Sequence, residues 1–397
     1  MSTDPTSRVF QALDDFRIEI PSWGFANTGT RFGKFLQPAA ATCIDEKFAD
    51  AGEVHRLTGC TPTLALHVLW DLPNGLADVE NVQKLARENG IAPGSINPNL
   101  FQEAEYKFGS IANPDAAVRE KAIAHLLESV AIGKALGSAE VSLWIADGSN
   151  YPGSQSMRRR ISWIKEALAR THAALSSGQT MLVEYKPFEP AFYHTDIADW
   201  GMALELARSA GPQAKVLVDT GHHYQATNIE QIVAWLLDLN ALGGFHFNDR
   251  KYADDDLTLG SIDPYQVFRI FHELLYDKRL RGASAQAPAF MIDQSHNLKG
   301  KMEAMVQTVA TAQELYAKAA LVDHAHLEIL QDSCRLVDAE ECFRSAFWTD
   351  VRPLVRQWRE KNGLAPDPLA ALHQSGYVER IAAERGAKNA AIASSYA

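Results

Sequence analysis

The chain has 397 residues, of which 46% are hydrophobic and 22% are charged. This composition is ordinary for a globular protein and provides enough apolar material for a large core. The formal net charge is −11, and the sequence contains no basic tract that could face a phosphate backbone. We therefore expect no nucleic-acid partner.

Targeting and redox features are equally plain. No stretch approaches the roughly 18 consecutive apolar residues of a membrane span, and the N-terminal residues lack the basic start and apolar run of a secretion signal. A cytoplasmic protein without membrane contact is expected. Free thiols are predicted because CxxC spacing is absent from the four cysteines, which are Cys43, Cys60, Cys334 and Cys342.

Short β-type runs alternate with helical patterns over the first three quarters of the chain. The predicted strands are residues 16–23, 63–70, 92–99, 139–145, 181–186, 215–219, 243–248 and 289–293. Proline and glycine interrupt the third, while residues 119–137 and 228–244 show clear helical patterns between strands. Eight such units predict an α/β fold, a (β/α)8 TIM barrel spanning residues 1–300.

The chain beyond the last predicted strand has a different pattern. Residues 301–397 are helical throughout by pattern. We predict a C-terminal helical extension that wraps its own barrel or clasps a neighbouring subunit, with a role in oligomerisation.

The stretch GFANTGTRFGKF, residues 24–35, follows the first predicted strand. Its glycines permit mobility, and Phe25, Phe32 and Phe35 permit closure over a bound molecule. A lid is predicted here, with Phe32 in contact with the substrate.

Polar residues end the last four predicted strands, at the barrel face where active sites form. These residues are Glu184, Asp219, His246 and Asp293. Any one of them could be an ordinary polar strand exit. Three carboxylates brought together are costly to bury without a counter-ion, so a divalent metal is predicted.

The same face offers ligands for a second ion. His222 lies in the turn after Asp219, and Asp254 and Asp256 lie in the loop after His246. Residues i and i+2 of an extended loop point the same way, so this pair can hold one ion while Asp255 faces out. The alternative is a solvated, helix-capping acidic loop. Carboxylate and imidazole ligands suit Mn²⁺, Mg²⁺ or Co²⁺.

Two more residues are candidates for chemistry. Lys186 lies two residues beyond Glu184 and is expected to face the barrel interior, where it could donate to a substrate oxygen. His67 could act as an acid or base on a sugar. The alternatives are a lysine extending out of the barrel mouth and a satisfied core histidine. Apolar substrate walls are predicted from Trp70, Phe101 and Trp144.

Several stretches together resemble one family. They are PSWGFANTGTRF, LHVLWD, WIADGSNYPG, EYKPFEPAFY, VDTGHH, GGFHFNDRKYADDDL and MIDQSHN, and they cover roughly residues 16–380. The chain resembles the metal-dependent L-rhamnose isomerases, in particular the bacterial type with relaxed specificity. Xylose isomerases are the broader relatives.

The resemblance implies two metal sites and a homotetramer. Glu184, Asp219, His246 and Asp293 would hold a structural ion, and His222, Asp254 and Asp256 a catalytic ion, with Mn²⁺ the expected metal and Co²⁺ or Mg²⁺ the alternatives. His67, or a water near Asp293, would help to open the sugar ring. Tyr185 stands where better-studied members have histidine, and strand alternation should point it away from the centre.

The predicted activity is reversible aldose–ketose isomerisation. L-Rhamnose would be converted to L-rhamnulose, with side activity on D-allose and D-psicose, L-mannose and L-lyxose. Two alternatives are a ketose 3-epimerase, which needs one metal site, and a non-catalytic sugar-binding barrel. A DNA-repair endonuclease on such a barrel conflicts with the net charge of −11.

Overall fold

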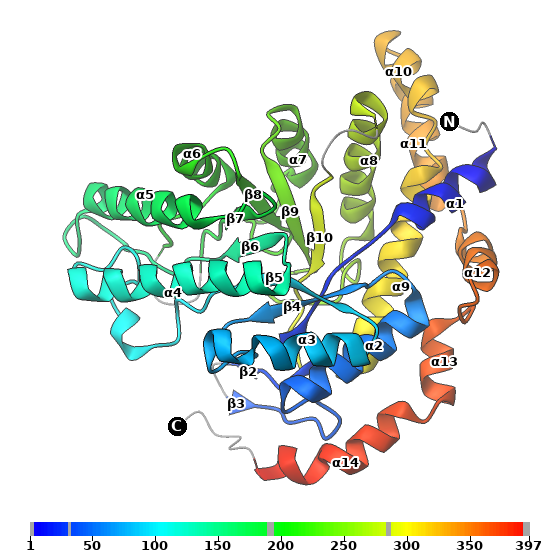
Figure 1. Cartoon of the computed structure of the whole chain (residues 1–397). Helices are drawn as coiled ribbons and strands as arrows, with labels where there is room; N and C mark the ends of the chain where they lie inside the picture. Colours follow the sequence, from blue (N-terminus) through cyan, green and yellow to red (C-terminus); the bar gives the residue numbers. More distant parts are fainter. Residues whose placement is uncertain (1–3, 31–32, 189–193, 283–286, 392–397) are drawn as a thin grey trace.

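A computed structural model describes residues 4–30, 33–188, 194–282 and 287–391. Eight parallel strands form one sheet (Figure 1), in the order β1-β4-β5-β6-β7-β8-β9-β10. The strands are β1 Ile20–Pro21, β4 Thr63–His67, β5 Ala92–Asn97, β6 Glu140–Leu143, β7 Thr180–Glu184, β8 Ala214–Asp219, β9 Leu242–Phe247 and β10 Ala289–Ile292.

The residue before β1 joins the first strand to the last. Glu19 pairs in parallel with Met291, and its backbone N–H donates to the Phe290 carbonyl at 2.7 Å. The Ile292 N–H donates to the Glu19 carbonyl at 2.9 Å. Because these bonds bring the sheet edges together, the prediction of a (β/α)8 barrel is confirmed.

A helix follows each strand of the barrel. These helices are α2 Ile44–Thr58, α3 Val79–Glu88, α4 Ala116–Leu136, α5 Met157–Ala174, α6 Trp200–Ala210, α7 Ile229–Asp238, α8 Pro264–Arg281 and α9 Lys301–Ala320. Asp115, Asp199, Asn228 and Asp263 begin four of them, each with its side chain accepting a first-turn N–H. Short 3₁₀ turns occupy Ser22–Phe25, Gly75–Asp78 and Ala104–Tyr106.

All eight predicted strands exist, but six are shorter than predicted, and the first two of these have a clear physical reason. The first covers Ile20–Pro21 rather than 16–23, because Pro21 has no N–H donor and the chain turns into a 3₁₀ helix. The second ends at His67 rather than 70. There Leu69 adopts a left-handed φ of 79°, and the N–H groups of Trp70 and Asp71 fold back onto the His67 carbonyl. The helix predicted over 228–244 ends at Asp238, before β9.

The helices beyond the barrel strands wrap around the same chain. Helix α9 packs against α8, α1 (Pro5–Asp15) and α2. It therefore occupies the position of the eighth barrel helix, whereas the sequence prediction assigned these residues to the C-terminal extension after residue 300. The helices α10 His324–Asp332, α11 Leu336–Trp348, α12 Arg352–Lys361, α13 Pro368–Gln374 and α14 Tyr377–Ala391 follow. Figure 1 shows them descending one side of the barrel until α14 reaches the strands β2 and β3.

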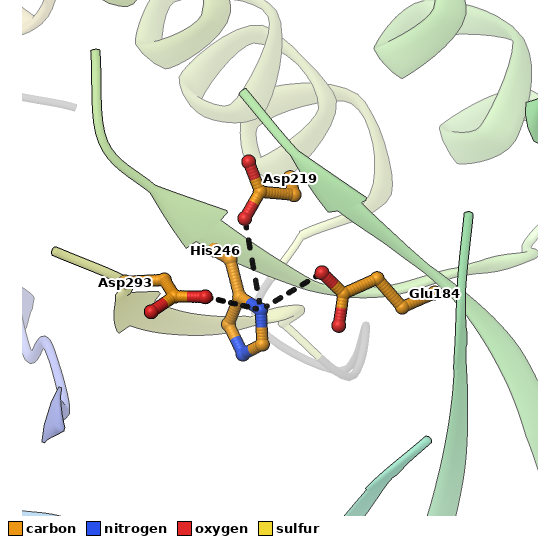
Figure 2. Close-up of side chains that lie close together, drawn as sticks. All are labelled: Glu184, Asp219, His246 and Asp293. Atoms are coloured by element: carbon orange, nitrogen blue, oxygen red, sulfur yellow. Dashed lines mark hydrogen bonds and ion pairs between the residues drawn. The ribbon is translucent and has the colours of Figure 1, made fainter. Parts of the chain in front are cut away.

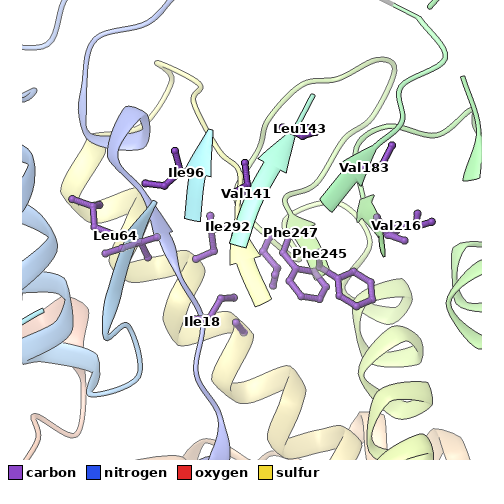
Figure 3. Close-up of a cluster of buried hydrophobic side chains, with 14 of the residues drawn as sticks. Ile18, Leu64, Ile96, Val141, Leu143, Val183, Val216, Phe245, Phe247 and Ile292 are labelled. Atoms are coloured by element: carbon purple, nitrogen blue, oxygen red, sulfur yellow. The ribbon is translucent and has the colours of Figure 1, made fainter. Parts of the chain in front are cut away.

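The core lies between the strands and the surrounding helices (Figure 3). The alternation of side chains along β9 shows which residues enter this core. Phe245 and Phe247 are fully buried and stack at 4.7 Å between ring centroids, while His246 between them points to the opposite face of the sheet. The apolar outer face of each strand therefore holds the helices, and the inner face delivers polar side chains to the barrel mouth.

The predicted lid contains a small hairpin made of β2 Gly29–Thr30 and β3 Gly33–Lys34. Phe25 is fully buried in the core, so the prediction that it closes over a substrate is wrong. Phe35 is 65% exposed, and Phe32 lies outside the described residues.

No helix in the described part of the chain is long and apolar enough to cross a membrane. All four cysteines are free, as predicted.

Phe271 of α8 tests the core. Its buried ring meets Phe247 at 5.2 Å and Tyr316 at 5.2 Å between centroids. Replacing it with alanine opens a large cavity, so Phe271→Ala should lower the free energy of unfolding by about 3–5 kcal/mol. Urea unfolding followed by circular dichroism measures this. Phe108→Ala, at a position 57% exposed, is the control and should stay within about 0.5 kcal/mol of the parent. Equal losses in both variants would contradict this packing.

Candidate metal and sugar site

Four side chains converge at the C-terminal ends of adjacent strands. Ligand atoms of Glu184, Asp219, His246 and Asp293 all lie within 4.8 Å of one another. His246 Nδ1 is 3.3 Å from Glu184 Oε1, 3.7 Å from Asp293 Oδ2 and 3.9 Å from Asp219 Oδ2, as Figure 2 shows. One ring nitrogen thus faces three carboxylates.

Parallel register creates this cluster. Asp219 pairs with His246 across β8 and β9, while Glu184 ends β7 and Asp293 follows β10. Since parallel strands end at one face of a barrel, side chains remote in sequence meet there. The four predicted strand-end residues are brought together.

The first cluster is electrostatically strained. Burial and the neighbouring carboxylates raise the pKa of Asp219 to about 7, although His222 opposes the shift. Burial likewise raises the pKa of Asp293. Burial disfavours the charged forms of His246 and Glu184, but the attraction between these two groups outweighs it. The pKa of Glu184 is therefore lowered to about 2, and the pKa of His246 is raised to about 9. A cation among these groups would relieve the repulsion.

A second cluster lies beside the first and shares Asp219 with it. Asp219, His222 and Asp254 offer ligand atoms within 4.8 Å of one another. His222 Nε2 is 3.4 Å from Asp254 Oδ2 and 3.8 Å from Asp219 Oδ2. The other ring nitrogen, Nδ1, lies 3.1 Å from the Tyr185 carbonyl, which can only accept a hydrogen bond. The ring therefore presents Nε2 to the two carboxylates.

The acidic loop contributes its three aspartates differently. Asp254 is drawn into the site, whereas Asp255 accepts the N–H groups of Lys251 and Tyr252 and closes the turn. Asp256 adopts a left-handed φ of 47° and accepts from Ser295 Oγ at 2.6 Å. Asp256 is not part of the three-residue cluster, and its metal-ligand role stays a prediction.

Lys186 lies inside the barrel mouth. Its Nζ is 2.5 Å from Asp254 Oδ2 and 5.3 Å from the centre of the Trp144 ring. Burial alone would raise the pKa of Asp254, but His222 and the Lys186 ammonium outweigh it, so this pKa is lowered. The strand itself ends at Glu184, so the path of the loop, rather than strand alternation, places the lysine.

An aromatic wall lines the mouth beside these groups. Trp70 stacks on His67 at 3.7 Å between centroids, and Phe101 meets both rings edge-on and contacts Trp144 at 4.8 Å. His67 Nδ1 lies 3.1 Å from the Val68 carbonyl, which leaves Nε2 as the acceptor nitrogen of the neutral ring. The structure thus brings together three predicted wall residues and the predicted acid or base.

Two further residues, neither of them predicted as a site residue, complete the site. Trp23 Nε1 donates to Asp293 Oδ1 at 2.7 Å, and its ring meets His67 edge-on. Buried Asp71 accepts from Ser22 Oγ, from Lys47 Nζ and from the His67 N–H. Trp23 follows the first strand, so the strand-end rule that identified Glu184 would also have found it. No sequence signal marked Asp71.

The donor set fits hard divalent cations. Donor atoms about 2.1 Å from one ion lie about 3.0–3.4 Å apart, close to several of the separations seen here. Within the described part of the chain, Asp254 Oδ1 is buried without a hydrogen-bond partner, and leaving such an atom unpaired is costly unless a ligand binds it. Oxygen and imidazole donors suit Mn²⁺, Co²⁺ or Mg²⁺. The two clusters can therefore hold metal ions.

Comparisons with known proteins agree with this geometry. A family model described as "Xylose isomerase-like TIM barrel" matches residues 63–281. A probable sugar isomerase of Mesorhizobium japonicum is 41% identical over 380 residues, covering 94% of this chain and 87% of that protein. An L-rhamnose isomerase of Bacteroides thetaiotaomicron is 23% identical over 258 residues, covering 58% of this chain and 60% of that protein.

A solved structure of a D-allulose 3-epimerase from Methylomonas sp. shares the fold, with a TM-score of 0.55 and 15% identity over 74% of this chain and 95% of that chain. Fold and clusters together define a (β/α)8 barrel with a candidate metal centre at its mouth. The chain belongs to the xylose isomerase-like TIM barrel family.

His67 is expected to be neutral throughout the physiological pH range. Burial lowers its pKa to about 4, although the Val68 carbonyl opposes the shift. The neutral form stabilises the fold above pH ~6.5, and that contribution is lost as the pH falls from ~6.5 through 4. Imidazole NMR shifts should show His67 titrating near pH 4, and His67→Gln should flatten the loss of stability over this range. Titration near pH 6.5 would contradict the buried, stacked ring.

Proposed function

We propose that this protein is a metal-dependent aldose–ketose isomerase that interconverts L-rhamnose and L-rhamnulose, with side activity on D-allose, L-mannose and L-lyxose. The observation that carries the proposal is the pair of clusters sharing Asp219, with Lys186 Nζ 2.5 Å from Asp254 Oδ2 in the second. The similarity to probable sugar isomerases and to an L-rhamnose isomerase supports it.

Each residue has a definite task in this reaction. Glu184, Asp219, His246 and Asp293 would hold one divalent ion, and His222 and Asp254, with Asp256 and the shared Asp219, the other. Bound ions supply Lewis-acid polarisation of adjacent sugar oxygens. The Lys186 ammonium would donate to the sugar O1 and stabilise negative charge that develops there.

His67 acts at the sugar ring. Its Nδ1 faces the Val68 carbonyl, so Nε2 is free to accept the proton of the anomeric hydroxyl when the ring opens. The rings of Trp70, Phe101 and Trp144 form an apolar face against which sugar C–H groups can pack. Asp293 is fixed by Trp23 and can order a water beside the same hydroxyl.

Metal content and product identity test the proposal. Protein stripped with a chelator should bind two Mn²⁺ per chain and then form ketose from L-rhamnose faster than from D-allose.

Asp254→Asn and His222→Asn should lose turnover by at least about 100-fold while keeping the fold, and Glu184→Gln should lose both metal and stability. Asp255→Asn is the matched control, because the amide oxygen can still accept the two backbone bonds that close the turn.

A ketose 3-epimerase is the alternative on this barrel. It would bind one ion per chain and convert a ketose to its epimer without forming an aldose. Metal binding without turnover of any sugar would indicate a non-catalytic sugar-binding barrel. Full activity in Asp254→Asn would remove the catalytic centre proposed here.

Lys186→Met removes the ammonium group of Lys186 and tests its proposed role. The change should lower kcat by about 10²–10⁴-fold, because a positioned donor to the reacting oxygen is lost, while two Mn²⁺ per chain are retained. Lys165→Met is the control, since Lys165 pairs with Glu205 at 2.9 Å on a solvent-exposed helix face. Steady-state kinetics and metal analysis of the same samples measure both effects. An unchanged kcat would assign Lys186 to site structure alone.

The assembly and location follow the same family resemblance. We propose a homotetramer in the cytoplasm, with the helices after Ala320 available for contacts between subunits.

A further inference from the structure

The last helix is fastened to the barrel by a buried ion pair. Arg385 of α14 donates to both carboxylate oxygens of Asp50 in α2, at 2.7 and 3.0 Å, and the Tyr377 hydroxyl donates to the same group at 2.8 Å. Arg385 and Asp50 are 4% and 1% exposed. Such a pair holds one geometry because leaving either charge unpaired inside the protein is expensive.

One residue of α14 then reaches the segment beside the barrel mouth. Asn389 is 2% exposed, and its Nδ2 donates to the carbonyls of Pro38 and Ala40, both at 2.9 Å. Its Oδ1 accepts from Asn27 Nδ2 at 2.8 Å. Asn27 in turn accepts the Gln37 N–H at 2.8 Å. Residues on both sides of β2 and β3, namely Asn27 before them and Pro38 and Ala40 after them, are therefore hydrogen-bonded to Asn389 of α14. Figure 1 shows where α14 and these two strands lie.

The same segment is bonded to the loop that follows β10. Gln37 Nε2 donates to the carbonyls of Asn297 and Lys299 at 3.0 and 2.8 Å. Thr28 donates its hydroxyl to the Ser295 carbonyl and accepts from the Asn297 amide. Since Ser295 Oγ donates to Asp256 Oδ2 at 2.6 Å, hydrogen bonds run without a break from the C-terminal helix to the acidic loop.

We propose that Asn389 is a positioning residue of the sugar site: acting through Asn27 and the loop 294–299, it fixes Asp256 and the residues 27–30 and 33–40 beside the bound sugar. The inference rests on the proposed function for its kinetic consequence only. Among the described residues Asn389 has no hydrogen bond to a proposed catalytic group, and the three side-chain bonds it makes there go to the Pro38 and Ala40 carbonyls and the Asn27 amide. Removing the Asn389 side chain should therefore increase local opening of the segments beside the barrel mouth and leave the barrel strands intact.

Asn389→Ala tests the inference, with Asn362→Ala as the matched control because the Asn362 amide donates to the Trp358 carbonyl in its own helix. Hydrogen exchange of the chelator-stripped protein should accelerate about tenfold in 27–30, 33–40 and 294–299, and stay unchanged in β7 to β9. In the Mn²⁺-loaded enzyme, KM should rise about tenfold while kcat stays within about twofold. The control should match the parent.

A double variant separates positioning from general stability. If Asn389 acts through Asn27, adding Asn389→Ala to Asn27→Ala should increase exchange and KM little beyond the single Asn27→Ala change. Unchanged exchange in 27–40, faster exchange throughout the barrel, or fully additive effects would each overturn the proposal. If the parent turns over no sugar, the proposed function fails, while hydrogen exchange still decides the role of Asn389.

Discussion

The mutual repulsion of carboxylates at the barrel mouth is the constraint on which the rest of the site depends. Ligand oxygens of Glu184, Asp219 and Asp293 lie within 4.8 Å of one another, one of Asp254 lies within the same distance of Asp219, and all four side chains are largely removed from water. Burial raises the pKa values of Asp219 and Asp293, and the like charges of the neighbouring carboxylates raise them further. The arrangement is stable only with partners that carry positive charge or donate hydrogen bonds.

The fold supplies those partners from elements on every side. Asn248 Nδ2 donates to both oxygens of Asp219, Trp23 donates to Asp293, and Lys186 binds Asp254. Trp23 binds Asp293 Oδ1 and leaves Oδ2 facing His246, and Lys186 binds Asp254 Oδ2 and leaves Oδ1 without a hydrogen-bond partner among the described residues. This is the arrangement expected around a metal: outer groups orient the ligands, and the ligands remain free for the ion.

Hydrogen bonds also orient the site residues that lie outside the two clusters. Asp71 fixes the backbone of His67 and the hydroxyl of Ser22, so the histidine and the Trp23 segment are held by one buried carboxylate that also binds Lys47. Much of the machinery proposed for the sugar therefore lies on loops, and two of these loops are bonded to helices: Asp71 binds Lys47 of α2, and Asn27 binds Asn389 of α14. Such preorganisation places reacting groups without a reorganisation cost during the reaction.

The sequence by itself determined the barrel and its acidic centre. Alternating apolar strands and amphipathic helices specify eight βα units, and the parallel ends of those strands must lie together, so Glu184, Asp219, His246 and Asp293 could be named from strand position alone. Only the tertiary structure decided the remaining details. The burial of Phe25, the turn at Leu69 that stacks Trp70 on His67, the different roles of Asp254, Asp255 and Asp256, and the reach of Asn389 to Asn27 depend on loop paths. Strand periodicity constrains where side chains of a regular element point, whereas loop paths are set by hydrogen bonds between segments hundreds of residues apart, which no local pattern encodes.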